Sequence, residues 1–116
     1  MKKVYVDNIK SKVNLSNQND YLAYLLTYQD GSTFVTRESD KASLWIKTVN
    51  NKVIKLPASI NYLGHLEFNA GILNKYLEPG TYLAEIVFDY QDTQAVYPHG
   101  NYLEVVCLPK TSSLMY

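Results

Sequence analysis

The residues able to do acid–base or metal chemistry are few and lie far apart along the chain. The two histidines, His65 and His99, are too few for most metal sites. His65 alternates with Leu66 and Phe68, which predicts that it points outward from a strand. No two acidic residues have a spacing that a strand or helix would use to pair them for acid–base catalysis. We therefore predict a non-enzymatic protein without catalytic residues, a metal site or cofactors.

The chain has one cysteine, Cys107, which excludes an internal disulfide and a cysteine-based zinc site. Leu103, Val105 and Cys107 are spaced two residues apart, so all three point to one face of the expected last strand. This spacing is typical of a small core residue, because a reactive cysteine needs an electropositive and partly exposed environment. We expect Cys107 to be buried and chemically unreactive.

The single tryptophan, Trp45, lies within Ser43–Lys47 and admits two interpretations. An exposed tryptophan on a strand can serve as a stacking platform for a ligand such as a sugar. On a strand it more often packs in the core, where its large ring buries apolar surface. We expect Trp45 to pack between sheets, and the platform interpretation belongs to the alternative function considered below.

Tyrosine is unusually abundant, with eleven residues beside three phenylalanines. Tyrosine is favoured in strands and at protein interfaces, where its apolar ring and polar hydroxyl are both used. The expected turn at residues 97–102 carries Tyr97, His99 and Tyr102. We predict these three residues as a contact surface, and a simple bent hairpin without a partner remains the alternative.

The net charge is zero, which argues against nucleic acid as the main partner, because phosphate binding needs a basic field. No apolar run is long enough for a membrane span, and Asp7 and Lys10 interrupt any signal-peptide core. We expect synthesis in the cytoplasm without export. Residues 1–58 hold nine basic and five acidic residues, whereas residues 59–116 hold two and six. The charges either interleave in the fold or form two poles that meet partners.

Turn signals recur about every ten residues, which favours a β-sandwich or barrel. Pro79-Gly80 is one such turn. After it, Tyr82, Ala84 and Ile86 point to one face and Leu83, Glu85 and Val87 to the other, as in a strand with one buried face. Residues 72–77 have the only helical spacing, and we expect them to cap one end of the fold. The predicted strands cover residues 3–13 (with a break near Asp7), 21–28, 33–36, 42–49, 52–56, 62–68, 82–90 and 95–108, the last interrupted at Pro98–Gly100.

The order of these segments resembles a known family. The segments are a basic first strand, Asn19-Asp20, a long strand closed by Gln29–Gly31, Ala42–Lys47, Gly64–Phe68, Leu73–Leu77 and Pro79–Ile86. This arrangement is similar to the N-terminal domain of upper baseplate proteins from tailed phages of Gram-positive bacteria. The resemblance spans roughly residues 3–108. It implies an all-β, immunoglobulin-like antiparallel β-sandwich with one short helix, formed by residues 1–108. Independently, the loss of alternation after Pro109 predicts a tail or the start of a linker at residues 109–116.

The resemblance also implies a function. Such a domain is a structural protein of the virion that docks on the tail hub and on neighbouring copies of itself in the baseplate. There it holds receptor-binding proteins, which family members attach through a C-terminal part that follows their linker. The alternative is a carbohydrate-binding β-sandwich used in adhesion to the host cell surface. A small β enzyme is a third and less favoured class, because the residues for catalysis are scattered.

Overall fold

The computed structural model describes residues 3–32 and 41–109, and these residues form an all-β fold, as the sequence predicts. The predicted strand at 33–36 and most of the predicted tail at 109–116 lie outside the described residues. The elements are β1 (Val4–Lys10), β2 (Lys12–Asn14), β3 (Tyr21–Tyr28), β4 (Ala42–Lys47), β5 (Val53–Ile60), β6 (Leu66–Asn69), the 3₁₀ helix η2 (Gly71–Lys75), β7 (Gly80–Asp89), β8 (Gln94–Tyr97) and β9 (Leu103–Leu108).

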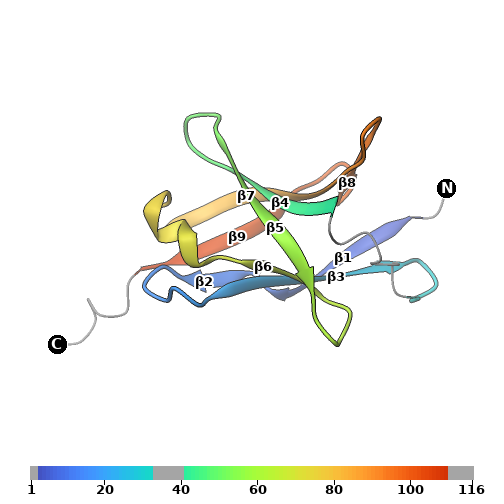
Figure 1. The fold of residues 1–116 in the computed structure, drawn as a ribbon, viewed down its shortest axis with the longest axis horizontal. Helices are drawn as coiled ribbons and strands as arrows, with labels where there is room; N and C mark the ends of the chain where they lie inside the picture. The colour runs from blue at the N-terminus through green and yellow to red at the C-terminus, as the bar shows by residue number, and fades with distance from the viewer. Residues whose placement is uncertain (1–2, 33–40, 110–116) are drawn as a thin grey trace.

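The strands form one nearly closed, barrel-like sheet in the order β1-β3-β6-β5-β4-β7-β9-β2, with β8 also paired to β7 (Figure 1). Hydrogen-bonded strands thus connect the two layers that the sequence prediction treats as separate sheets. The prediction of purely antiparallel pairing is wrong at one place, because β2 runs parallel to β9. The N-terminal segment supplies the strands at both ends of this order, β1 at one end and β2 at the other. Its second part, β2, runs in the same direction as β9.

The N-terminal segment changes partners at Ser11. Before it, β1 pairs antiparallel with β3, and after it β2 pairs with β9. The Ser11 carbonyl accepts a hydrogen bond of 3.0 Å from the Val106 amide at the crossing. The predicted break near Asp7 is therefore displaced to Ser11, and a register shift between Asn8 and Lys10 precedes it. A shift of this kind bends a strand, which lets one segment serve both halves of the barrel.

Strand β5 makes a similar change at Pro57. Its first part pairs with β4 as far as Pro57, and its last part, Ala58–Ile60, pairs with β6. The predicted strand 52–56 ends too early, because β5 continues through Pro57 to Ile60. Proline is tolerated there because the strand leaves one partner for another at that residue. The predicted strand 62–68 is reduced to β6, since residues 61–65 form a turn held by the Asn61 side chain.

The remaining predictions agree more closely with the structure. The predicted helix at 72–77 is the 3₁₀ helix η2, which buries Leu73. The predicted interruption at Pro98–Gly100 separates β8 from β9, and the bond between Tyr97 and Pro98 is cis. Inward-facing residues of every strand fill one core, with Tyr24, Phe68 and Phe88 as its largest fully buried side chains.

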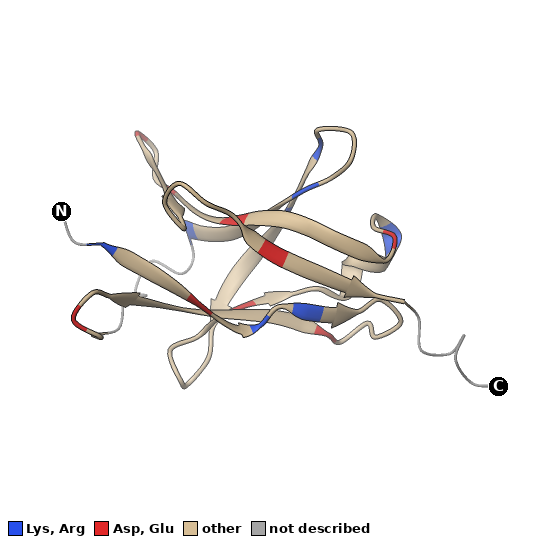
Figure 2. Cartoon of the chain, turned by 180° about the vertical axis from the view of Figure 1, so that it is seen from behind, with Lys and Arg blue, Asp and Glu red and all other residues tan. Residues whose placement is uncertain are grey.

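The strand order interleaves the two oppositely charged halves of the chain. Strand β6, from the second half, lies between β3 and β5, and β7 lies beside β4. Figure 2 shows acidic and basic residues on both layers rather than at two poles. The interpretation of two separate poles is therefore not supported.

Candidate functional site

Trp45 lies on the outside of the barrel, and its predicted place between sheets is wrong. In β4, Ala42, Leu44 and Ile46 are buried in the core, so the side chains of Ser43, Trp45 and Lys47 point to the opposite face. The sequence contains this signal, because Ser43 and Lys47, two residues before and after Trp45, are polar and share its face of the strand. Trp45 is half-buried by its neighbours on that face.

Two neighbours hold the Trp45 ring in place. Its indole Nε1 donates a hydrogen bond of 2.7 Å to the Ser43 hydroxyl. The ammonium group of Lys55, which pairs with Trp45 across β4 and β5, lies 4.1 Å from the ring centre. Such a cation–π contact is favourable by about 0.5–1 kcal/mol at an exposed site. A sugar stacking on that side of the ring would have to displace Lys55.

Lys47 forms a second cluster on the same face. Its ammonium group donates a hydrogen bond of 2.8 Å to the Tyr102 hydroxyl and lies 4.0 Å from the Tyr102 ring centre. The Glu85 carboxylate is 3.9 Å away. The hydrogen bond to Tyr102, together with the charge of Glu85, raises the pKa of Lys47 above its ordinary value. Lys47 therefore carries its charge at neutral pH.

An apolar residue adjoins these polar groups. Leu83 of β7 is 44% exposed and points to the same side as Glu85, two residues along the strand. We name this surface the outer face and define it by the following residues: Ser43, Trp45, Lys47, Lys55, Leu83, Glu85 and Tyr102. All but Tyr102 lie on paired strands, so their positions are fixed by the sheet. A rigid surface with aromatic, apolar and charged side chains is typical of protein recognition.

The three residues predicted as a contact surface differ in their exposure. Tyr102 and His99 are exposed, but Tyr97 is only 9% exposed and belongs to β8, where its ring packs edge-on against Phe88 at 5.9 Å. The prediction that Tyr97 projects from an exposed loop is therefore wrong. Its other face stacks against His99, with ring centres 5.1 Å apart. Tyr97 thus anchors His99 to the core by packing between Phe88 and the His99 ring. His99 and Tyr102 are the exposed members of the three.

The residues considered for chemistry remain apart in space. Cys107 is buried, as predicted, and burial raises the pKa of its thiol to about 11, so the nucleophilic thiolate is scarce at neutral pH. His65 is half-exposed at the end of the turn before β6. Within residues 3–32 and 41–109, no three histidine, cysteine or carboxylate side chains come close enough to hold a metal ion.

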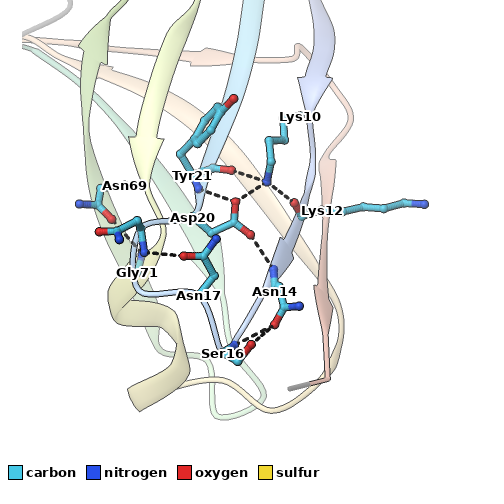
Figure 3. A network of polar contacts seen from close by, with 10 residues as sticks. Lys10, Lys12, Asn14, Ser16, Asn17, Asp20, Tyr21, Asn69 and Gly71 are labelled. Carbon is cyan, nitrogen blue, oxygen red and sulfur yellow. Dashed lines mark hydrogen bonds and ion pairs between the residues drawn. The ribbon is translucent and has the colours of Figure 1, made fainter. Parts of the chain in front are cut away.

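The most extensive polar network was not evident from the sequence. The Asp20 carboxylate, 8% exposed, accepts hydrogen bonds from the Lys10 ammonium group and from the backbone amides of Asn14 (2.7 Å) and Tyr21 (2.9 Å) (Figure 3). The Lys10 ammonium group also donates to the carbonyls of Lys12 (2.7 Å) and Tyr21 (3.0 Å). The network joins β1, β2 and β3 around the crossing at Ser11, so we assign it a structural role and name it the Lys10–Asp20 clamp.

Comparisons with known proteins add no family assignment. A scan against protein-family models gives no match, and a search of curated proteins finds no similar sequence. No helix within the described ranges is both long and apolar enough to span a membrane. The outer face, which combines aromatic, apolar and charged side chains, is the candidate functional site.

Proposed function

We propose that this chain is a non-enzymatic, immunoglobulin-like docking domain and serves as a structural protein of a phage virion. Its place would be the baseplate at the tail tip, where it docks on the tail hub and on neighbouring copies and helps to hold receptor-binding proteins. The combination of apolar, aromatic and charged side chains on the outer face is the observation that supports docking. The baseplate itself rests on the resemblance in the order of turns and strands.

Two features support the immunoglobulin-like assignment within the all-β fold. The N-terminal segment is divided between the two layers, and its second part, β2, pairs parallel with the last strand. The Tyr82 hydroxyl at the start of β7 donates a hydrogen bond of 2.7 Å to the carbonyl of Glu78, four residues upstream. A tyrosine that bonds back to the chain at this corner is a hallmark of immunoglobulin-like sandwiches.

The outer face supports docking on a protein because it combines exposed apolar area with fixed charges. Leu83 supplies apolar surface, Lys47 and Glu85 supply charges of opposite sign, and Tyr102 supplies an aromatic ring at the rim. Interfaces are enriched in aromatic residues, and complementary charges direct partners to the correct register. Multiple copies bound through modest interfaces of this type would give a rigid assembly.

The second candidate is a carbohydrate-binding module for adhesion to the host surface. It is favoured by the position of Trp45 outside the core, where an aromatic ring can stack on a sugar. The Lys55 ammonium group, 4.1 Å from the ring centre, and the hydrogen bond that fixes the indole argue against it. An open sugar platform needs an uncovered ring.

Trp45 fluorescence distinguishes the two functions, because this residue is the only tryptophan in the chain. We expect solubilised cell-wall glycans of the host to leave the emission unchanged, and purified tail hub protein to shift or quench it as the outer face becomes covered. A saturable change with glycans, and none with hub protein, would support the carbohydrate-binding function instead. No change with either would contradict both assignments of the outer face.

A further inference from the structure

A hollow lies at one end of the barrel, between the turn that joins β4 to β5 and the 3₁₀ helix η2. Its volume is about 630 Å³, within the range of roughly 300–1,000 Å³ typical of ligand sites. Both segments contribute lining residues, and Figure 1 shows the β4–β5 turn at the upper left with η2 below it at the left. The hollow is independent of the baseplate assignment, and only Lys55 belongs both to it and to the outer face.

The rim of the hollow is apolar and unusually exposed. Val49 in the turn is 88% exposed and Tyr76 after η2 is 65% exposed. Val53 and Ile72 contribute further exposed apolar surface from the two sides. Apolar side chains that gather around a concave surface, rather than being scattered singly, mark a binding site.

The charges in the hollow have one sign. Lys52, Lys55 and Lys75 line it, and none of the described lining residues is acidic. The ion pairs found in the described ranges are Lys10–Asp20 and Lys47–Glu85, so none of the three lysines has a carboxylate partner there. Figure 2 shows basic residues on the β4–β5 hairpin. A partner that carries carboxylates would complement this field.

The wall of the hollow is the free edge of a strand. Residues 53–57 of β5 pair with β4 on one side, whereas only Ala58–Ile60 pair with β6 on the other. The Thr48 amide donates a hydrogen bond of 2.8 Å to the Lys52 carbonyl, so these two residues form a hydrogen-bonded pair. Hydrogen-bonded and non-hydrogen-bonded pairs alternate from there along β4 and β5, which makes Val53 and Lys55 members of non-hydrogen-bonded pairs. The amides and carbonyls of Val53 and Lys55 therefore point away from β4, and no described strand pairs with them. Pro57, without an amide hydrogen, ends this edge.

We propose that the hollow binds an extended segment of a partner protein that alternates acidic and apolar side chains. The segment adds as a short strand to the β5 edge at Val53 and Lys55, a mode of recognition in which backbone bonds give affinity and side chains give specificity. Its carboxylates lie near Lys52 and Lys75, and its apolar side chains contact Ile72 and Tyr76. A nucleic acid would use the lysines but leave the apolar rim without a partner.

Three capped peptides, DVDLD, NVNLN and KVKLK, test the proposal when they are titrated into the ¹⁵N-labelled protein. We expect DVDLD to shift amide resonances of residues 48–55 and 71–76 and to slow hydrogen exchange of the Val53 and Lys55 amides. NVNLN should bind at least about tenfold more weakly, and KVKLK should cause no shift. Absence of shifts with DVDLD, or equal shifts with KVKLK, would overturn the proposal.

Variants locate the binding and control for net charge. The double variant Lys52→Glu with Lys75→Glu should bind DVDLD at least about tenfold more weakly, whereas Lys3→Glu with Lys12→Glu, which has the same net charge outside the hollow, should bind as the wild type does. The ¹⁵N spectra verify that each variant is folded. Equal losses in both variants would contradict a localised site. Tighter binding of single-stranded oligothymidylate than of DVDLD at residues 48–55 would replace the protein partner by a nucleic acid.

Discussion

Two tyrosine hydroxyls in this domain differ in their hydrogen bonding. Tyr24 is fully buried, and its hydroxyl has no hydrogen-bond partner among the described residues. Burial alone raises the pKa of Tyr24 far above its ordinary value. Tyr82 is half-buried, and its hydroxyl donates to the Glu78 carbonyl. The first hydroxyl should therefore cost stability, and the second should contribute to it.

Phenylalanine substitutions at these two positions should change stability in opposite directions. Removing an unsatisfied buried hydroxyl relieves a desolvation cost of about 1–3 kcal/mol, so Tyr24→Phe should raise the free energy of unfolding by about 1 kcal/mol. Tyr82→Phe loses one hydrogen bond and should lower it by about 1 kcal/mol. Urea denaturation followed by circular dichroism measures both. A loss of stability in Tyr24→Phe would show that the hydroxyl has a partner.

The Cys107 thiol should react slowly in the folded protein. It is 2% exposed, and burial raises its pKa to about 11, so both access and the thiolate fraction are reduced. We expect labelling by a thiol reagent at pH 8 to be at least ~100-fold slower in native buffer than in denaturant, because the thiolate is the reactive form. Labelling at the same rate in both conditions would contradict the burial of this strand face.

The site residues illustrate what alternation along a strand can predict. The burial of Cys107 follows from its spacing with Leu103 and Val105, and the structure confirms it. The same argument places Trp45 outside, with Ser43 and Lys47, but the general preference of tryptophan for cores favours the wrong face. The contacts of Lys47 with Tyr102, 55 residues apart, depend on tertiary packing, which no local pattern contains.

At the scale of elements, the Lys10–Asp20 clamp holds the N-terminal segment where it passes between layers. Burial would raise the pKa of Asp20, but hydrogen bonds from Lys10 and from the Asn14 and Tyr21 amides outweigh it and lower that pKa below 3.8. The carboxylate therefore contributes stability above the pKa near 3.9 of an unfolded aspartate, and this contribution is lost as pH falls through the lower folded pKa.

Asp20→Asn should lower the free energy of unfolding by about 2 kcal/mol at pH 7, the scale of a hydrogen bond to a charged group. The variant should also lose part of the decrease in stability between about pH 5 and pH 2, because the titrating carboxylate is gone. Urea denaturation at several pH values measures both effects. Curves for wild type and variant that stay parallel down to pH 2 would show that Asp20 does not carry this dependence.

Gly71 begins η2 where the chain passes close to the loop before β3. A Cβ atom at this position would overlap the backbone carbonyl of Gln18, which cannot move as a side chain could. Gly71→Ala should therefore lower the free energy of unfolding by about 1–3 kcal/mol. Ile72→Ala, at the neighbouring position that is 45% exposed, should stay within about 0.5 kcal/mol of wild type. Equal stability of the two variants in thermal denaturation would contradict the close approach.

The elements were predictable where turn residues bound an alternating segment, as at β7, or an apolar run, as at β3. Prediction failed where a strand changes partners. Pro57 reads as an end of β5, yet the strand continues to Ile60 because it joins β6 there. Ser11 has no distinctive sequence signal, yet the N-terminal segment leaves β3 for β9 at that point. Such changes are set by the partner strands, which are distant in sequence.

For the domain as a whole, the outer face is the surface that we propose to dock on a protein. The barrel holds this face on neighbouring strands, and the interleaved strand order places Lys47 beside Glu85 from the opposite half of the chain. The face is small, so a single domain should bind a partner weakly, and many copies should bind together. The hollow at the end of the barrel would add a second, separate contact.

Calorimetric titration of the purified tail hub protein into this domain measures docking on the outer face, with Leu83→Asp as the outer-face variant. Ile9→Asp is the matched control, because Ile9 is 46% exposed against 44% for Leu83 and lies on β1 away from the outer face. We predict that wild type and Ile9→Asp bind the hub alike and that Leu83→Asp binds at least about tenfold more weakly, since it replaces the exposed apolar residue of the outer face by a charge. Equal binding by all three would show that the outer face does not dock on the hub, and absence of binding by the wild type would exclude the hub as a partner.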